Sequence, residues 1–270
     1  MEGPPLKAIA ESLSSVAGNK IISAYGNAKI DITNLEGKTI NRIFSIGKNL
    51  LFQLPEDTVR VHFGMFGSYT IDNPRENIKP SLSLKTQNTI IEFYRCSIKL
   101  IPNQELNTIF DEEVDITSER WNVQKVLKLI LNQQDELICD VLLDQTVFAG
   151  VGNIIKNEVL FLARVHPLSR TGNVPKEKIE EIINQARSFS ITFYESRKKG
   201  QRLNTYLKIY QRSKCRGSGE KVLRIITGEK KAIKLCMPRS TIPILILHYF
   251  WNKALSRYFK KEYTESSSIS

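Results

Sequence analysis

The sequence of 270 residues is 41% hydrophobic and carries 39 Lys and Arg against 28 Asp and Glu, a net charge of +11. This length can bury the core of one or two domains, and the longest apolar stretch, residues 242–250, is interrupted by Pro243 and His248, which excludes a bilayer-spanning helix. The charge favours a polyanion as partner through counterion release, with a merely basic soluble protein as the alternative.

The chain begins with Met1-Glu2-Gly3-Pro4-Pro5, which lacks the positive charge and apolar run of a secretory signal. We expect Gly-Pro-Pro to form a stiff entry, with a helix only after it. The spacing of the following apolar residues predicts an amphipathic helix. Its buried face would be Leu6, Ile9, Ala10 and Leu13. An ordinary N-terminal cap is the simplest interpretation of these residues by themselves.

Residues 20 to about 110 contain short runs rich in Ile, Val, Phe, Tyr and Thr, separated by Gly, Asn, Asp and Pro. Such regular strands with turn residues between them predict an all-β sandwich or barrel. From Thr117 the spacing of apolar residues is that of amphipathic helices, and near Leu203 the sequence again resembles that of β-strands. We therefore predict an α+β multidomain chain. Its parts would be a β domain with a leading helix (1–112), a helical domain (113–200), a β-hairpin (201–243) and a divergent, partly disordered tail (244–270).

The most informative segment is residues 144–167, DQTVFAGVGNIIKNEVLFLARVHP. Two helical stretches are joined there by a glycine turn, and the second helix is predicted to begin near Asn153. The free N–H groups at a helix start beside a glycine turn can hold a phosphate. Lys156 would add positive charge in the first helical turn. An unremarkable helix hairpin is an equally good interpretation of this segment alone.

Three further positions have both a structural and a functional interpretation. Lys48 lies at a turn between strands, where a lysine is usually a solubilising charge. His62 lies in an apolar strand and is more often a satisfied core histidine than a catalyst. Met65 and Phe66, with glycine on either side, form an apolar tip that packing alone could explain.

The four cysteines, Cys96, Cys139, Cys215 and Cys236, have irregular spacing and no secretory signal accompanies them, which indicates a reducing compartment rather than a disulfide framework. We expect an intracellular protein, in the cytoplasm or at the nucleoid. A structural zinc site needs four ligands, typically from two Cys-x-x-Cys pairs. Beside Cys215 and Cys236 the partner positions hold Ser218 and Arg239. We therefore expect no zinc, with the two cysteines as remnant ligands, and no other cofactor.

Together these pieces occur in an order that resembles the formamidopyrimidine-DNA glycosylase/endonuclease VIII family of base-excision-repair enzymes, in its endonuclease VIII-like branch. The resemblance covers roughly residues 1–240. It rests on Glu2-Gly3-Pro4, Gly47-Lys48, His62-Phe63-Gly64-Met65, residues 144–167 and the half-lost zinc ribbon. It implies an N-terminal β-sandwich, a helix–two-turns–helix domain and a C-terminal β-hairpin finger, with DNA held in the cleft between domains.

The activity that the resemblance implies is that of a DNA glycosylase with AP-lyase activity, which removes oxidised bases, pyrimidines above all, from damaged double- or single-stranded DNA. The implied nucleophile is the α-amine of Met1. An N-terminal amine has a pKa near 8, so part of it is neutral at pH 7, and it can form a Schiff base at C1′. Glu2 would shuttle protons, and Lys48 would contact the phosphate near the lesion.

The resemblance also implies DNA-binding roles for His62, Met65, Asn153, Lys156 and Lys231. Asn153 matches the family's phosphate-binding asparagine, and Met65 matches a position that fills the gap left by an everted nucleotide. Lys231 stands where the family has an arginine, which grips phosphate in a bidentate way that lysine does not.

Several positions depart from the family pattern. Relatives commonly expose Pro or Val after the initiator methionine is removed, whereas Glu2 follows Met1 here, so we expect Met1 to be retained. Pro5 replaces a second glutamate, and the resemblance ends beyond Cys236. These departures leave two alternatives open: a paralogue that binds damaged or abasic sites with weak or no catalysis, and a general basic nucleic-acid scaffold. In each case we expect a monomer that does not associate with membranes.

Overall fold

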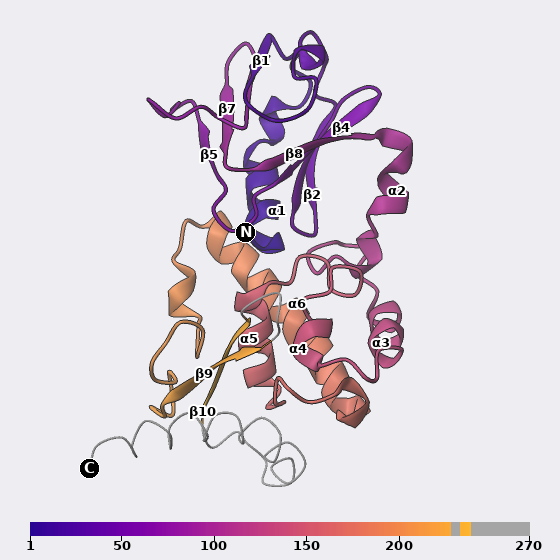
Figure 1. Ribbon diagram of the computed structural model, residues 1–270, viewed down its shortest axis with the longest axis vertical. Helices are drawn as coiled ribbons and strands as arrows, with labels where there is room; N and C mark the ends of the chain where they lie inside the picture. Colours follow the sequence, from indigo (N-terminus) through magenta and orange to yellow (C-terminus); the bar gives the residue numbers. More distant parts are fainter. Residues whose placement is uncertain (228–232, 239–270) are drawn as a thin grey trace, which may run out of the picture.

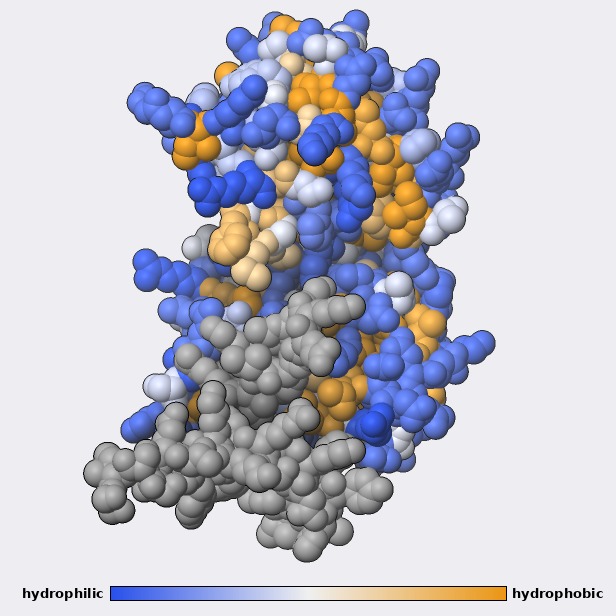
Figure 2. Space-filling view, viewed as in Figure 1, coloured by the Kyte–Doolittle hydropathy of each residue, from blue (hydrophilic) through white to orange (hydrophobic). Residues whose placement is uncertain are grey.

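The computed structural model describes residues 1–227 and 233–238, with side chains described as far as residue 222. A β-rich part, a helical part and a separate β-hairpin follow one another along the molecule, and the N-terminus lies where the first two parts meet (Figure 1). The predicted α+β architecture is confirmed. Among the coloured residues on the face in Figure 2, hydrophilic side chains predominate and hydrophobic ones form smaller patches.

The first helix, α1 (Gly3–Ser12), buries the predicted apolar face of Leu6, Ile9, Ala10 and Leu13. The expectation that a helix forms only after Gly-Pro-Pro is wrong, because α1 begins at Gly3 and includes both prolines. Proline fits the first helical turn because the N–H that it lacks has no intrahelical partner there. The residue before the helix, Glu2, is therefore the N-cap.

The β-rich part is a sandwich of two antiparallel four-stranded sheets, as predicted. One sheet has the order β1 (Ser23–Tyr25), β6 (Leu82–Lys85), β7 (Ile90–Tyr94), β5 (Ser68–Ile71). The other has the order β2 (Arg42–Ile46), β3 (Asn49–Gln53), β4 (Asp57–His62), β8 (Ser97–Pro102). The core between the sheets and α1 includes Phe52, Phe63 and Phe93, whose rings meet edge to face.

The helical part contains α3 (Val123–Leu131), α4 (Ile138–Val141), α5 (Asn153–Leu162) and the long α6 (Lys176–Lys198). A short helix, α2 (Leu106–Ile109), leads into it from β8. The predicted helix start at Asn153 is confirmed. The core lies between α3, α5 and α6 and includes Phe148, Val159 and Ile182. Short 3₁₀ turns complete the connections (Ser14–Val16, Thr33–Leu35, Asn103–Glu105, Glu112–Val114, Thr171–Asn173 and Leu203–Thr205).

After α6 the chain forms an antiparallel hairpin of β9 (Val222–Thr227) and β10 (Ile233–Pro238), in which Cys236 pairs with Arg224. A hairpin was predicted here. Lys231 and the tail from residue 244 lie outside the described residues, as does Arg239. The boundaries at residues 112, 200 and 243 remain predictions.

Candidate active site

Three backbone segments meet at the start of the chain: residues 1–3, the β2–β3 turn at Gly47, and the turn before α5. The Gly3 N–H donates to the Gly150 carbonyl at 2.9 Å. A Cβ on Gly3 would lie 2.8 Å from Gly150 Cα and 3.0 Å from the Gly47 oxygen. Side chains are excluded by this close approach, so the glycines bring the terminus against both turns.

The Glu2 carboxylate lies at the N-terminus of α5. Its Oε1 accepts a hydrogen bond from Ile154 N at 2.7 Å, and its Oε2 accepts one from Ile155 N at 3.3 Å. The helix start is thus an anion site, as one interpretation of the sequence held, but the anion on these two N–H groups is the protein's own carboxylate and not a phosphate. The positive end of the helix dipole favours a negative charge there.

Gly152 makes room for this carboxylate, a role that sequence reasoning missed. A Cβ on Gly152 would lie 2.5 Å from Glu2 Cδ. Its backbone angles, φ −124° and ψ −162°, suit any residue, so only the space beside Glu2 requires glycine. The Gly-Val-Gly spacing indicated a close approach to the backbone at this turn, although it does not identify the group that approaches Gly152.

The Met1 amine donates to the carbonyl of Gly64 at 2.8 Å, so it lies beside the β4–β5 loop. Burial lowers the pKa of this amine below 8.0, Glu2 opposes the shift, and the charge of Lys48 adds to it. Burial raises the pKa of Glu2, against the opposing effects of the Ile154 N–H and of Lys48. The site therefore combines an amine that loses its proton readily with a carboxyl group that holds one more readily than usual.

Lys48 is half-buried in the β2–β3 turn, and its charge acts on both Met1 and Glu2. Asp115, in the segment that connects the two domains, holds this turn in place: Gly47 N donates to Asp115 Oδ2 at 2.7 Å. The other carboxylate oxygen, Asp115 Oδ1, accepts a hydrogen bond from Thr117 N at 2.7 Å. Asp115 is only 1% exposed and was not singled out from the sequence. Lys48 is thus part of the site and more than a solubilising charge.

His62 lies at the end of β4, half-buried, with Nδ1 3.3 Å from Asn49 Oδ1. Arg60 Nε donates to the same oxygen at 2.7 Å. Burial lowers the pKa of His62, and the charges of Arg60, the Met1 amine and Lys48 lower it further against a hydrogen bond to the Lys48 backbone. His62 is therefore neither a core residue nor a free surface cation.

Met65 and Phe66 are 86% and 72% exposed at the tip of the β4–β5 loop. The interpretation that packing explains this apolar tip is wrong. Because the Gly64 carbonyl in the same loop accepts the bond from Met1, the exposed tip lies directly beside the amine.

The first turn of α5 holds two predicted DNA-binding residues in different environments. Asn153 is exposed, whereas Lys156 is 0% exposed, and Lys156 Nζ donates to Asn153 Oδ1 at 3.0 Å. The expectation that Lys156 presents its charge to DNA is wrong, because its ammonium group is enclosed by protein. It instead orients the amide of Asn153.

Cys215 is buried with Ile209 and Val222 in a small apolar cluster beside Phe161. Among the described residues, no three His, Cys, Asp or Glu side chains gather in a way that could hold a metal ion. The described surroundings of Cys215 therefore do not supply the four ligands of a closed zinc site. The side chain of Cys236 is not described, so the absence of zinc stays a prediction.

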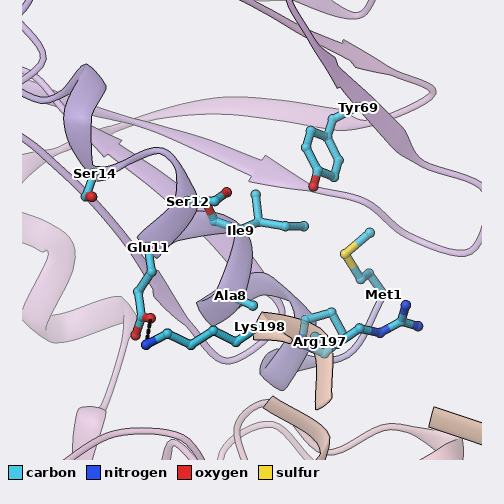
Figure 3. A pocket seen from close by; sticks show the side chains of 10 residues that line it. Met1, Ala8, Ile9, Glu11, Ser12, Ser14, Tyr69, Arg197 and Lys198 are labelled. Atoms are coloured by element: carbon cyan, nitrogen blue, oxygen red, sulfur yellow. Dashed lines mark hydrogen bonds and ion pairs between the residues drawn. The ribbon is translucent and has the colours of Figure 1, made fainter. Parts of the chain in front are cut away.

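A cavity of about 800 Å³ opens beside Met1, between α1, β5 and the last turn of α6. In Figure 3 the side chains of Met1, Tyr69 and Arg197 border one end of it, and the Glu11–Lys198 ion pair lies at the other. Pro5 and Ile9 also line it. The cavity is thus built from both domains.

Comparison with protein families gives two matches. Residues 2–106 match the formamidopyrimidine-DNA glycosylase N-terminal domain, and residues 113–192 match the formamidopyrimidine-DNA glycosylase H2TH domain. Among curated proteins, the chain is 31% identical to endonuclease 8-like 3 of Xenopus laevis over 229 residues, which is 81% of this chain and 37% of that protein. It is 32% identical to the Mus musculus protein of that name over 246 residues, 87% of this chain and 40% of the relative. The chain therefore spans less than half the length of these relatives.

Among solved structures, formamidopyrimidine-DNA glycosylase of Lactococcus lactis, non-covalently bound to AP-site DNA, has a TM-score of 0.78. That match is 22% identical and covers 89% of this chain and 99% of the other. A viral DNA glycosylase has the same TM-score and coverage. Within the described residues, no helix combines the length and apolarity needed to cross a membrane. Both domain matches, their order and the shared fold establish that the chain belongs to the formamidopyrimidine-DNA glycosylase/endonuclease VIII family.

Proposed function

We propose that this chain is a base-excision-repair DNA glycosylase with AP-lyase activity, which acts on oxidised bases, pyrimidines above all. One observation carries the proposal: Met1, whose primary amine has a lowered pKa, lines a cavity, and the next residue, Glu2, has a carboxyl group of raised pKa whose charge acts on that amine. A nucleophile with a proton shuttle beside it is the arrangement that glycosidic bond cleavage through a Schiff base requires.

The proposed reaction uses the lone pair of the neutral Met1 amine. That pair forms a bond to C1′ of the damaged nucleotide while the bond from C1′ to the base breaks, and the base leaves with the bonding electrons and a proton. Glu2 delivers this proton to the base, and its carboxylate then takes a proton from the Met1 nitrogen, which became positively charged on attack. Glu2 passes that proton to O4′ as the C1′–O4′ bond breaks and the nitrogen lone pair forms the C1′=N bond of the imine. The two N–H groups of α5 hold the carboxylate in place during these transfers.

The proposed substrate is damaged DNA with its target nucleotide everted, which brings C1′ to Met1 and the base into the cavity. The charge of +11 supports a polyanionic substrate. Lys48, His62 and Asn153 would contact the strand near the lesion, and Met65 would fill the gap in the duplex. Lys231 would contact a phosphate from the finger. We propose that the protein acts as a monomer in the cytoplasm or at the nucleoid.

Borohydride trapping on an oligonucleotide with a single abasic site tests the nucleophile. We expect a covalent protein–DNA adduct, which mass spectrometry places on the peptide that contains Met1. Acetylation of the terminus, or a tag that extends it, is expected to abolish trapping while DNA binding persists, since only the amine is blocked.

Two results would contradict the proposal. An adduct on an internal lysine would remove Met1 from the chemistry. Damage-selective DNA binding without any adduct would instead support the alternative, a paralogue with little or no catalysis. Zinc is a separate matter: we propose that the finger folds without it, and stoichiometric zinc in the purified protein would overturn that part alone.

A further inference from the structure

The far end of α1 is joined to α6 by a cluster of three polar side chains, which we call the clasp: Glu11, Tyr194 and Lys198. The Tyr194 hydroxyl lies 2.7 and 2.6 Å from the two carboxylate oxygens of Glu11 and donates to that carboxylate. Lys198 Nζ lies 3.1 Å from Glu11 Oε2 and donates to the Tyr194 hydroxyl at 3.2 Å. Glu11 thus links the β-sandwich domain to the helical domain.

Within the clasp, the hydrogen bond from Tyr194 to Glu11 contributes more than the ion pair between Lys198 and Glu11. Tyr194 is only 8% exposed, and a short hydrogen bond to a charged group is about twice as strong as a neutral one. The Lys198 side chain is 56% exposed, and ion pairs in such surroundings contribute little. Burial would raise the pKa of Glu11, but the hydrogen bonds from Tyr194 and Lys198 outweigh it and hold that pKa below its usual value.

Lys198 of the clasp lies in the last turn of α6, next to Arg197, and both residues border the cavity beside Met1. Arg197 and Lys198 both line the cavity, and the charge of Arg197 acts on Tyr69 across it. The Arg197 guanidinium is 5.6 Å from the centre of the Phe193 ring on its own helix. Arg197 is itself exposed, so the place of its guanidinium depends on where the helix end is held.

We infer that the clasp positions Arg197 as the cavity group that contacts the everted base, so that Glu11 and Tyr194 are positioning residues for base selection. The inference rests on the proposed function. A guanidinium presents several N–H donors in a fixed plane, which suits the carbonyl oxygens of an oxidised pyrimidine ring. An abasic site has no base to place in the cavity, so the clasp matters only to the excision step.

Tyr194→Phe tests this directly, because it removes one hydroxyl and keeps the ring. The substrates are a duplex with a single 5-hydroxyuracil and the same duplex with a preformed abasic site. We expect excision of the base to fall about tenfold, as the loss of a hydrogen bond to a charged group would give. The rate of strand cleavage at the abasic site is expected to change by less than about twofold.

Arg197→Ala is expected to reproduce this selective loss. If the clasp acts through Arg197, the double variant Tyr194→Phe/Arg197→Ala is no slower than Arg197→Ala alone, because coupled residues are not additive. Tyr206→Phe removes a hydroxyl that bonds to Gln201 outside the cavity and is the matched control.

Equal losses on both substrates would overturn the inference, since the clasp would then only hold the domains together. Additive losses in the double variant would overturn it as well. These results are distinct from failure of the proposed function, in which the wild-type chain itself neither excises the base nor forms a trapped adduct.

Discussion

The first turn of α5 and the tip of the β4–β5 loop adjoin the same amine but are built in opposite ways. In the α5 turn, polar groups are enclosed and paired: Glu2 receives two backbone N–H groups, and the buried Lys156 donates to Asn153. At the loop tip, large apolar side chains are left in the open, with Met65 at 86% exposure. One region is thus held by internal hydrogen bonds, and the other presents an exposed apolar surface.

Under the proposed function, the enclosed groups of the α5 turn would take part in proton transfer and the exposed tip would contact the duplex. Groups that transfer protons benefit from preorganisation, because their geometry then needs no change during the reaction. A side chain that enters a base stack must instead remain exposed until the stack opens. Substitutions in the α5 turn are thus expected to have the larger effect on rate, and substitutions at the tip an effect that depends on the strandedness of the DNA.

The largest effect is expected from the carboxylate at α5. Glu2→Gln should slow base excision by about 100-fold, the range for loss of a general acid–base group, yet leave adduct formation at preformed abasic sites. Gly152→Ala is expected to slow base excision by about tenfold. The new Cβ would lie 2.5 Å from Glu2 Cδ and would therefore displace the carboxylate. Single-turnover excision kinetics measure both.

The fold should survive Gly152→Ala, since the atoms that must move belong to a flexible side chain. Its unfolding midpoint is expected within about 3 °C of wild type. Gly172→Ala, whose Cβ would meet Gln134 Cβ at 3.1 Å, is the control for replacement of a glycine elsewhere in the helical domain. Wild-type excision by Gly152→Ala would show that the position of Glu2 does not limit the reaction.

Lys48→Met should produce an intermediate effect, visible in the pH dependence of trapping. Adduct formation needs the neutral Met1 amine, so trapping is lost as the pH falls through the pKa of that amine. Lys48 helps burial to lower this pKa. Removal of its charge therefore shifts the midpoint of the profile to higher pH, and loss of one phosphate contact lowers the salt slope of DNA binding by about one.

Lys176→Met, at the far end of α6, is the control for a general loss of charge. The midpoint should not move in that variant. A midpoint that moves to lower pH in Lys48→Met would contradict the electrostatic role of Lys48 beside Met1.

The smallest effect is expected at the exposed tip. Met65→Ala should slow excision from duplex DNA by roughly fivefold, because the gap left by the everted nucleotide is no longer filled. Excision from single strands should be unchanged, since they contain no stacked gap. Ile78→Ala, a half-exposed apolar residue of the sandwich, is the control. Equal slowing on both substrates would remove Met65 from the eversion step.

The sequence by itself determined the local elements and the family. Apolar periodicity located the buried face of α1, runs of β-branched and aromatic residues between turn residues located the short strands, and the glycine turn located the start of α5 at Asn153. These features depend on neighbours a few residues apart, and their physical causes can be found in the sequence. The family resemblance also implied that Met1, Glu2 and Lys48 belong to one site.

Only the tertiary structure decided which groups those residues meet. Glu2 and the N–H that binds it are 152 positions apart, and Glu11 and Tyr194 are 183 apart. No local pattern distinguishes a helix start that binds phosphate from one that binds a carboxylate of the same chain. Nor does the sequence around Lys156 show that this lysine is buried and not at the surface. Burial and pKa depend on the sum of long-range contacts, and those contacts exist only once the two domains have packed around the chain terminus.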